Sequence, residues 1–163
     1  MVNKSLRLAA LTLVIGFIAV GSLEAQTDPR LNGRWVGTFE GMETELRLNN
    51  GVFEELSNGI PLSRGTFRTS NNTMTMNPTH LFGGTMNFIL GYAILESRWL
   101  TINEFILGLR TGFRELGVPD VETNALIDYF ISPPVSSYSV DATTLISVTT
   151  IGGERVEMIY HRR

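Results

Sequence analysis

Apolar and polar side chains alternate along the first part of the chain with a period of two, which is typical of half-buried antiparallel strands. Trp35, Gly37 and Phe39 fall on one face of a first predicted strand, and Leu46 and Leu48 fall on one face of the next. The alternation predicts short strands that each bury one face.

Turn signals separate these strands. Asn50-Gly51 is a strong two-residue hairpin signal, because both central positions of such a turn need positive φ. Ser57-Asn58-Gly59 predicts the next turn. Residues 67–76 and 138–147 each predict a strand, a tight turn and a second strand, and Gly152-Gly153 predicts the last turn. The chain therefore predicts about eight or nine antiparallel strands, which must close or form a sandwich to avoid open edges.

The middle of the chain changes period. After an apolar stretch from Met86 to Leu95 that we interpret as a strand, residues 101–117 have apolar side chains at helical spacing. Thr101 and Glu104 have the spacing of a capping box. A second, shorter helix is predicted from Asp120 to about residue 131. The predicted fold is thus mainly β: an up-and-down antiparallel barrel of about eight strands, with a helical hairpin at about 101–131 inserted before the last strands.

The first 25 residues have the features of an export signal. Lys4 and Arg7 precede an apolar run over residues 8–20, and Ala25 provides a small residue for cleavage. The run is shorter than the roughly 20 residues of a membrane span. We expect a signal peptide at 1–25, a mature domain at 26–163 with no membrane span after cleavage, and a periplasmic or secreted location. An uncleaved N-terminal anchor is the alternative.

Composition excludes several classes of chemistry. The chain has no cysteine, so thiol catalysis is excluded and an exported domain must be stabilised by packing. Lys4 is the single lysine, and a mature domain without lysine cannot form a Schiff base. The formal net charge of −3 leaves no basic footprint, so no nucleic-acid partner is expected.

Candidate catalytic and metal-binding chemistry is sparse. His80 and His161 are isolated and lack metal-ligand spacing. Glu43 and Glu45 share a strand face, with Glu54-Glu55 on the neighbouring strand, and a solvated outer face explains Glu43 and Glu45 better than a cation site does. No serine lies in a nucleophile elbow. The sequence predicts no catalytic residue, no metal and no cofactor, and the protein is not expected to be an enzyme.

The first and last strands carry a family resemblance. Gly33-x-Trp35 on the first strand, with Tyr160-x-Arg162 on the last, resembles the lipocalin and fatty-acid-binding superfamily, and bacterial lipocalin-like (calycin-type) domains in particular. The resemblance implies that Trp35 plugs one end of the barrel and that Arg162 lies across its ring in a cation–π contact. An ordinary core position for Trp35 is the alternative.

Three functions are compatible with such a barrel. The first is binding of a small, apolar ligand, because an eight-stranded barrel is just wide enough for one. The lower wall of its predicted pocket is formed by Phe39, Leu46 and Met74. The helical hairpin is predicted to cover the pocket as a lid, and its upper wall is formed by Phe105, Leu109 and Phe113. The second is an interaction or structural module of the cell envelope, with a filled barrel and a protein partner. The third, an enzyme on the same scaffold, lacks a visible acid/base constellation.

Overall fold

Eight antiparallel strands close into a barrel, as the sequence predicts. The structure, a computed structural model, describes residues 27–39, 41–131, 135–151 and 154–163. Neighbouring strands pair in the order β4-β3-β2-β1-β9-β8-β7-β5, and pairing of β4 with β5 closes the circle. The strands are β1 (Gly33–Phe39), β2 (Met42–Asn49), β3 (Val52–Ser57), β4 (Ile60–Ser70), β5 (Thr73–Phe82), β7 (Ser136–Val140), β8 (Thr144–Ile151) and β9 (Glu154–Arg162).

Tight turns with left-handed residues set the register of the early hairpins. Asn50 and Gly51 have φ of 47° and 82° between β2 and β3, which confirms the predicted two-residue turn. Asn71 and Asn72 have φ of 49° and 57° and reverse the chain between β4 and β5. Asparagine tolerates this backbone conformation better than other non-glycine residues. The turns therefore follow from local sequence.

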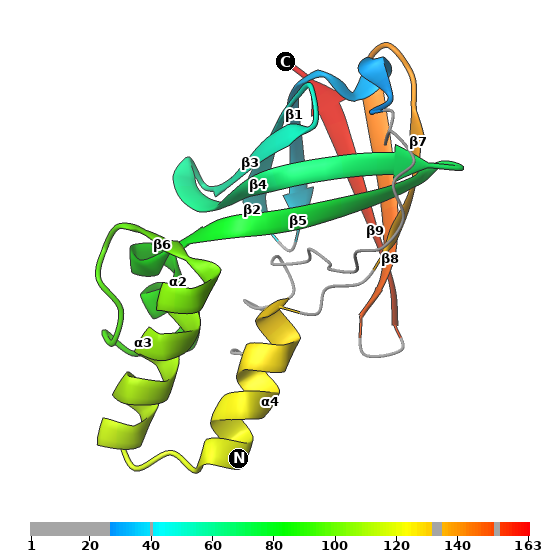
Figure 1. Cartoon of the computed structure of the whole chain (residues 1–163). Helices are drawn as coiled ribbons and strands as arrows, with labels where there is room; N and C mark the ends of the chain where they lie inside the picture. Colours follow the sequence, from blue (N-terminus) through cyan, green and yellow to red (C-terminus); the bar gives the residue numbers. More distant parts are fainter. Residues whose placement is uncertain (1–26, 40, 132–134, 152–153) are drawn as a thin grey trace.

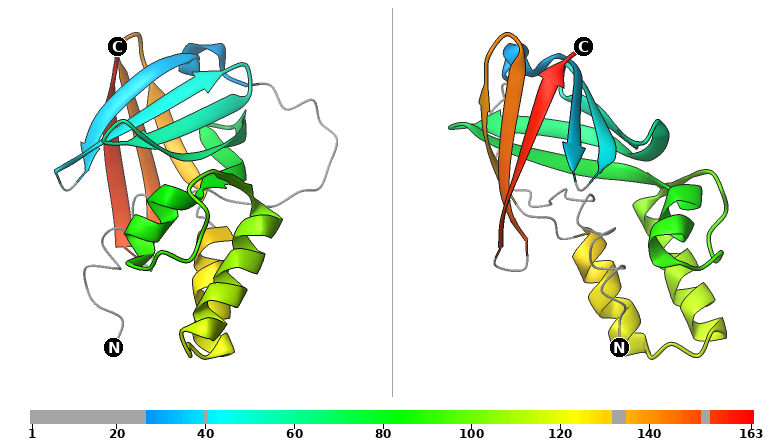
Figure 2. Two further views of the ribbon diagram at one scale, coloured as in Figure 1. Left: turned by 90° about the vertical axis from the view of Figure 1, so that its left-hand side faces the viewer. Right: turned by 180° about the vertical axis from the view of Figure 1, so that it is seen from behind.

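An insertion between β5 and β7 carries the helices. It consists of α2 (Gly83–Leu90), β6 (Trp99–Thr101), α3 (Ile102–Glu115) and α4 (Asp120–Ile131), with β6 paired to the end of β5. Figures 1 and 2 show these helices together beyond the barrel, next to the end of β5. The predicted capping box is confirmed, because the Thr101 hydroxyl accepts from the Glu104 N–H while the Glu104 carboxylate accepts from the Thr101 N–H.

The expected strand at 86–95 is wrong: α2 occupies the start of this stretch. Gly91 ends the helix with φ of 73°, and the loop that follows folds back on Asn87. The Asn87 amide oxygen accepts from the N–H groups of Ile94 and Leu95, and its amide nitrogen donates to the Leu95 carbonyl. One half-buried side chain thus satisfies backbone groups of a loop that has no strand partner there.

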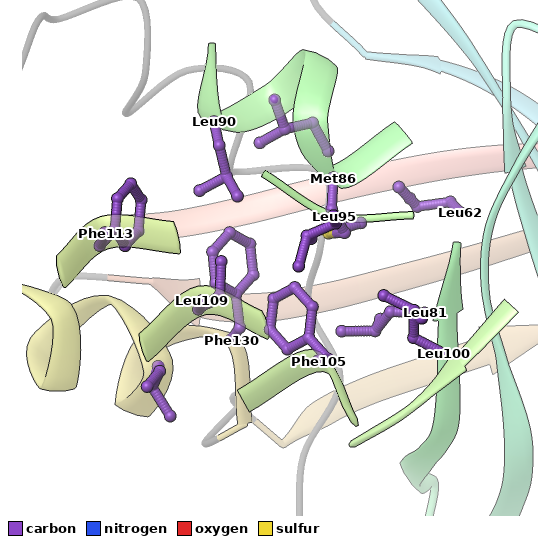
Figure 3. Close-up of a cluster of buried hydrophobic side chains, with 12 residues drawn as sticks. Leu62, Leu81, Met86, Leu90, Leu95, Leu100, Phe105, Leu109, Phe113 and Phe130 are labelled. Carbon is purple, nitrogen blue, oxygen red and sulfur yellow. The ribbon is translucent and has the colours of Figure 1, made fainter. Parts of the chain in front are cut away.

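Buried apolar side chains form two separate clusters. The barrel core lies inside the strands and is composed of Leu31, Trp35, Leu46, Leu48, Phe53, Phe67, Met74, Tyr138, Leu145 and Tyr160. The insertion core joins the three helices to Leu62 of β4, Leu81 of β5 and Leu100 of β6 (Figure 3). The Phe105 and Phe130 rings meet edge to face within it, with centroids 5.6 Å apart, and so link α3 to α4.

Candidate functional site in the barrel interior

The six residues of the predicted apolar pocket do not come together. Leu46 and Met74 belong to the barrel core, whereas Phe105, Leu109 and Phe113 belong to the insertion core. Phe39 is half-buried at the β1–β2 turn, outside both clusters. The helices pack their apolar side chains against one another and against the ends of β4 and β5. The side chains expected to form the upper wall therefore lie within the insertion core.

Trp35 contacts the partner that the resemblance implies. Its side chain is fully buried, and its indole N–H donates to the Leu31 carbonyl at 2.7 Å. The Arg162 guanidinium carbon lies 4.3 Å from the centroid of the Trp35 ring. Arg162 also donates to the carbonyls of Asn32 and Arg30, at 3.0 and 2.6 Å. Cation–π contact and hydrogen bonds together hold the first turn of the described chain against Trp35 and Arg162.

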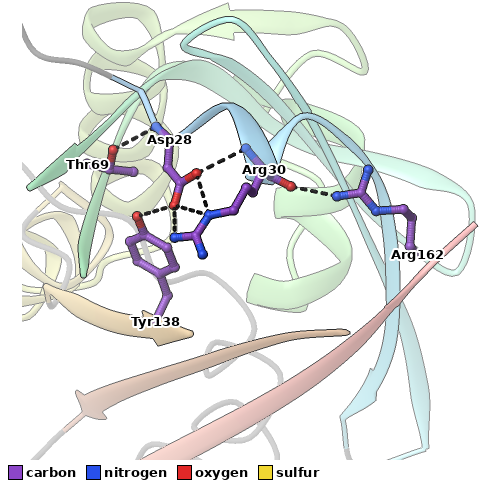
Figure 4. Close-up of polar contacts among 5 residues, drawn as sticks. All are labelled: Asp28, Arg30, Thr69, Tyr138 and Arg162. Carbon is purple, nitrogen blue, oxygen red and sulfur yellow. Dashed lines mark hydrogen bonds and ion pairs between the residues drawn. The ribbon is translucent and has the colours of Figure 1, made fainter. Parts of the chain in front are cut away.

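A second polar group fastens the same segment from the other side (Figure 4). The Asp28 carboxylate accepts from the Arg30 guanidinium and, at 3.1 Å, from the Tyr138 hydroxyl. The Asp28 N–H donates to the Thr69 hydroxyl at 2.9 Å. The hydrogen bond from Arg30 is the main reason why the pKa of Asp28 lies below its usual value. Hydrogen bonds thus tie the segment before β1 to β4, β7 and β9.

A row of polar side chains crosses the barrel interior. In the strand register Tyr160 stands opposite Gly37, and Gly37 stands opposite Thr44. Glu55 lies on the next strand, diagonal to Thr44, and is the register partner of Ser63 on β4. A Cβ atom on Gly37 would lie 3.1 Å from the Tyr160 ring, so the glycine makes room for that ring. Five adjacent strands thus bring these groups into one interior region.

Glu55 is the chemically unusual member of this row. Its side chain is buried, and the Ser63 hydroxyl donates to its Oε2 atom at 3.0 Å. Burial raises the pKa of the carboxyl to about 8, against a smaller lowering by the Ser63 hydrogen bond. Burial and the nearby Glu55 carboxyl also raise the pKa of the Tyr160 hydroxyl. At neutral pH the barrel interior therefore holds an uncharged carboxylic acid next to a phenol.

Two buried hydroxyls in the interior have no hydrogen-bond partner within the described part of the chain. They belong to Thr44, in the polar row, and to Thr149 on β8. A buried hydroxyl without a partner costs free energy, and nearly all such groups in folded proteins are paired. The interior thus offers unused hydrogen-bonding capacity, and the Thr44 hydroxyl provides it on the strand next to Glu55.

The sequence distinguishes Glu55 from the other carboxylates through alternation alone. Glu45 lies on the outer face of β2, where Arg34 donates to it at 2.7 Å and Arg47 covers its other oxygen. Successive strand residues point to opposite faces, so Glu55 must share the interior face with Phe53 while Glu54 faces outward. The period of two is therefore the available signal: Glu54 and Glu55 belong to opposite faces of β3 and do not act as one carboxylate pair.

A pocket of about 240 Å³ lies between α2 and the ends of β2, β3 and β4. Met42, Ile60, Leu62, Phe88 and Ile89 make its lining mainly apolar. Ser57 also lines it, and Ser57 is the register partner of Thr44. The pocket therefore adjoins the polar row at the barrel end opposite Trp35.

These features define a class by shape: a closed eight-stranded antiparallel barrel, consistent in general form with a lipocalin-like barrel, with a helix-containing insertion between β5 and β7. No protein-family model, curated protein or solved structure matches this chain. Among the described residues, none of the helices has the length and apolarity needed to span a bilayer. Within the same residues, no cluster of three or more His, Asp or Glu side chains is placed to hold a metal ion.

Proposed function

We propose that this chain is an exported, lipocalin-like binding protein that holds one small, largely apolar ligand in the barrel interior. One observation carries the proposal: Glu55 and two unpaired threonine hydroxyls are buried in the barrel. A barrel that serves only as a scaffold is most stable when its interior is apolar or fully hydrogen-bonded. A ligand with a polar group gives these side chains the partners that they lack.

The proposed ligand site has an apolar part and a polar part, the usual composition of small-molecule sites. Leu46, Met74 and Phe53 supply apolar contacts from the barrel core, while Glu55 and Thr44 orient the polar group. Entry by way of the α2 pocket brings a ligand to Ser57, directly opposite Thr44. In this proposal α2, and not the α3–α4 hairpin, is the helix next to the entrance.

The alternative is a non-enzymatic interaction module of the cell envelope with a filled barrel. Phe88 on α2 has an exposed fraction of 82%, and Ile60 beside the same pocket has 53%. Large apolar side chains at such exposure favour contact with another protein. In this alternative the pocket rim, and not the barrel interior, is the functional surface.

A binding titration separates the two functions. Residues 26–163 are titrated with N-phenyl-1-naphthylamine, an uncharged apolar fluorophore, and with decan-1-ol as a competitor. We expect saturable binding that Thr44→Leu weakens by about tenfold, because the larger side chain fills space beside Glu55 and removes a hydroxyl. Thr38→Leu is the matched control, since Thr38 is exposed on the opposite face of the neighbouring strand.

The outcomes for wild type and variants are distinct. Equal weakening by the two leucine variants, with unchanged melting temperatures, places the probe outside the interior and contradicts the proposal. Absence of saturable binding by the wild type leaves the envelope module. Export has its own test: mass spectrometry of the native protein should find a start at or near Gln26, and an intact Met1 start in a cytoplasmic fraction contradicts it.

A further inference from the structure

We propose that the ligand carries a protonated amine and that the Glu55 carboxylate is its counter-ion inside the barrel. This inference rests on the proposed function, because it concerns the same interior site. The interior groups of the described strands favour this chemical class, a protonated amine, at the polar end of the ligand.

The first step is the free acceptor capacity of Glu55. Ser63 donates to Oε2, and no other hydrogen bond to the Glu55 carboxyl is found among the described residues. Oε1 is thus available as an acceptor in a buried location. The Thr44 hydroxyl, on the neighbouring strand, is also unpaired among the described residues. An ammonium group has three donors and no acceptor, so it matches an interior rich in free oxygen acceptors.

The second step is the absence of a positive charge in the interior. Every arginine of the described chain is exposed, and none is among the buried polar side chains. A fatty acid or another carboxylate would therefore enter a site with no cation and with a second carboxyl already present. A carboxylate that is buried in a low dielectric without a cation carries a large desolvation cost. The arrangement discriminates against anionic ligands and favours cationic ones.

Binding of a protonated amine changes the protonation of Glu55. In the empty protein at neutral pH, Glu55 holds a proton because burial raises its pKa to about 8. When a protonated amine binds, Glu55 gives up this proton to solvent and the ammonium keeps its own, so one proton is released per ligand. Tyr160 is the titratable group facing Glu55 from β9, and Ser63 faces it from β4. Arg34 and Arg47 bind Glu45 on the outer face of the neighbouring strand.

The experiment compares three probes with one alkyl chain and different polar ends: decylamine, decan-1-ol and decanoate. Each displaces N-phenyl-1-naphthylamine from residues 26–163 at pH 7.5, below its micellar concentration. We expect decylamine to bind about tenfold or more tightly than decan-1-ol, since a charge-assisted bond is stronger than a neutral one. Decanoate should bind most weakly, since its charge would be buried without a cation. Affinity for decylamine should rise from pH 6 to pH 9, by about tenfold per pH unit well below the pKa of Glu55.

Glu55→Gln tests the assigned residue, and Glu54→Gln is its control on the outer face of the same strand. Glu55→Gln should abolish the preference for decylamine over decan-1-ol and its pH dependence, while decan-1-ol binding persists. Isothermal titration in buffers of different ionisation enthalpy measures proton release on the wild type, independently of any variant.

Three results would overturn the amine assignment: decanoate binding as tightly as decylamine, an amine preference that survives Glu55→Gln, or decylamine binding without release of a proton at pH 6–7. If neither the fluorophore nor any of the three probes binds the wild type, the proposed function itself fails. The two failures are therefore distinguishable.

Discussion

Replacing Glu55 with glutamine should stabilise the protein, and the gain should grow as the pH rises. The carboxyl has a pKa of about 8 in the folded protein, against an ordinary value of 4.5. Below pH 4.5 both folded and unfolded chains hold the proton, so the group adds no pH dependence. Between these two values only the folded chain holds it, so stability falls as pH rises. Glutamine keeps a neutral polar side chain at every pH and removes this loss.

The magnitude follows from the size of the pKa shift. Each unit of difference between the folded and unfolded values corresponds to about 1.4 kcal/mol of unfolding free energy. The wild type should thus lose roughly 3 kcal/mol between pH 4.5 and 7, and about 5 kcal/mol as an upper limit by pH 9. Glu55→Gln should match the wild type near pH 4 and exceed it by these amounts at higher pH.

The assay is urea unfolding of the wild type, Glu55→Gln and Glu54→Gln at unit intervals from pH 4 to 9. Glu54→Gln controls for loss of one negative charge from the same strand, and its curve should run parallel to that of the wild type. A constant difference between Glu55→Gln and the wild type across this range would refute a neutral buried acid at this position. A buried carboxyl that lowers the unfolding free energy is typical of a group that serves binding and not folding.

Three further changes test the packing. Trp35→Ala should cost about 3 to 5 kcal/mol in urea unfolding, the range for deleting a large buried aromatic, and Trp99→Ala, at a half-buried position, should cost less; equal losses would contradict the role of Trp35 in closing the barrel end. Gly112→Ala should lower the melting temperature despite a helix-propensity gain of about 1 kcal/mol, because the new methyl would fall 2.5 Å from a side-chain carbon of the loop before β6. Thr111→Ala, exposed on the same helix, should leave the melting temperature unchanged. A stabilised Gly112→Ala would refute this close approach. Thr101→Ala should cost about 1 kcal/mol by removing the cap of α3, and an unchanged urea midpoint would show that the cap is dispensable.

Local chemistry in the sequence determines most elements of this fold. Asn50-Gly51 specifies a two-residue turn wherever it lies, because few other residues accept positive φ at both positions. Thr101 and Glu104 begin a helix through bonds that span three residues. The alternation of β1 and β2 fixes which side chains share a face before any partner strand is known. These interactions are short in sequence, so the pattern alone predicts them.

Neighbours distant in sequence decide the rest. Gly112 reduces helix propensity, and only the packed structure supplies its reason, the side chain of Ile94 against the helix. The stretch from Met86 is apolar enough for a strand, but it forms α2, which buries Met86, Ile89 and Leu90 against side chains of β4, β5 and the other helices.

The candidate site depends on the same long-range information. Alternation places Glu55 on the face of Phe53, but closure of β4 onto β5 makes that face an interior. Register across β9, β1 and β2 then brings Tyr160 towards Thr44 and Glu55. The pKa of a carboxyl depends on the water and charges around it, which a strand pattern does not contain. The sequence thus determines which side chains can face inward, and the closed barrel alone determines what they meet there.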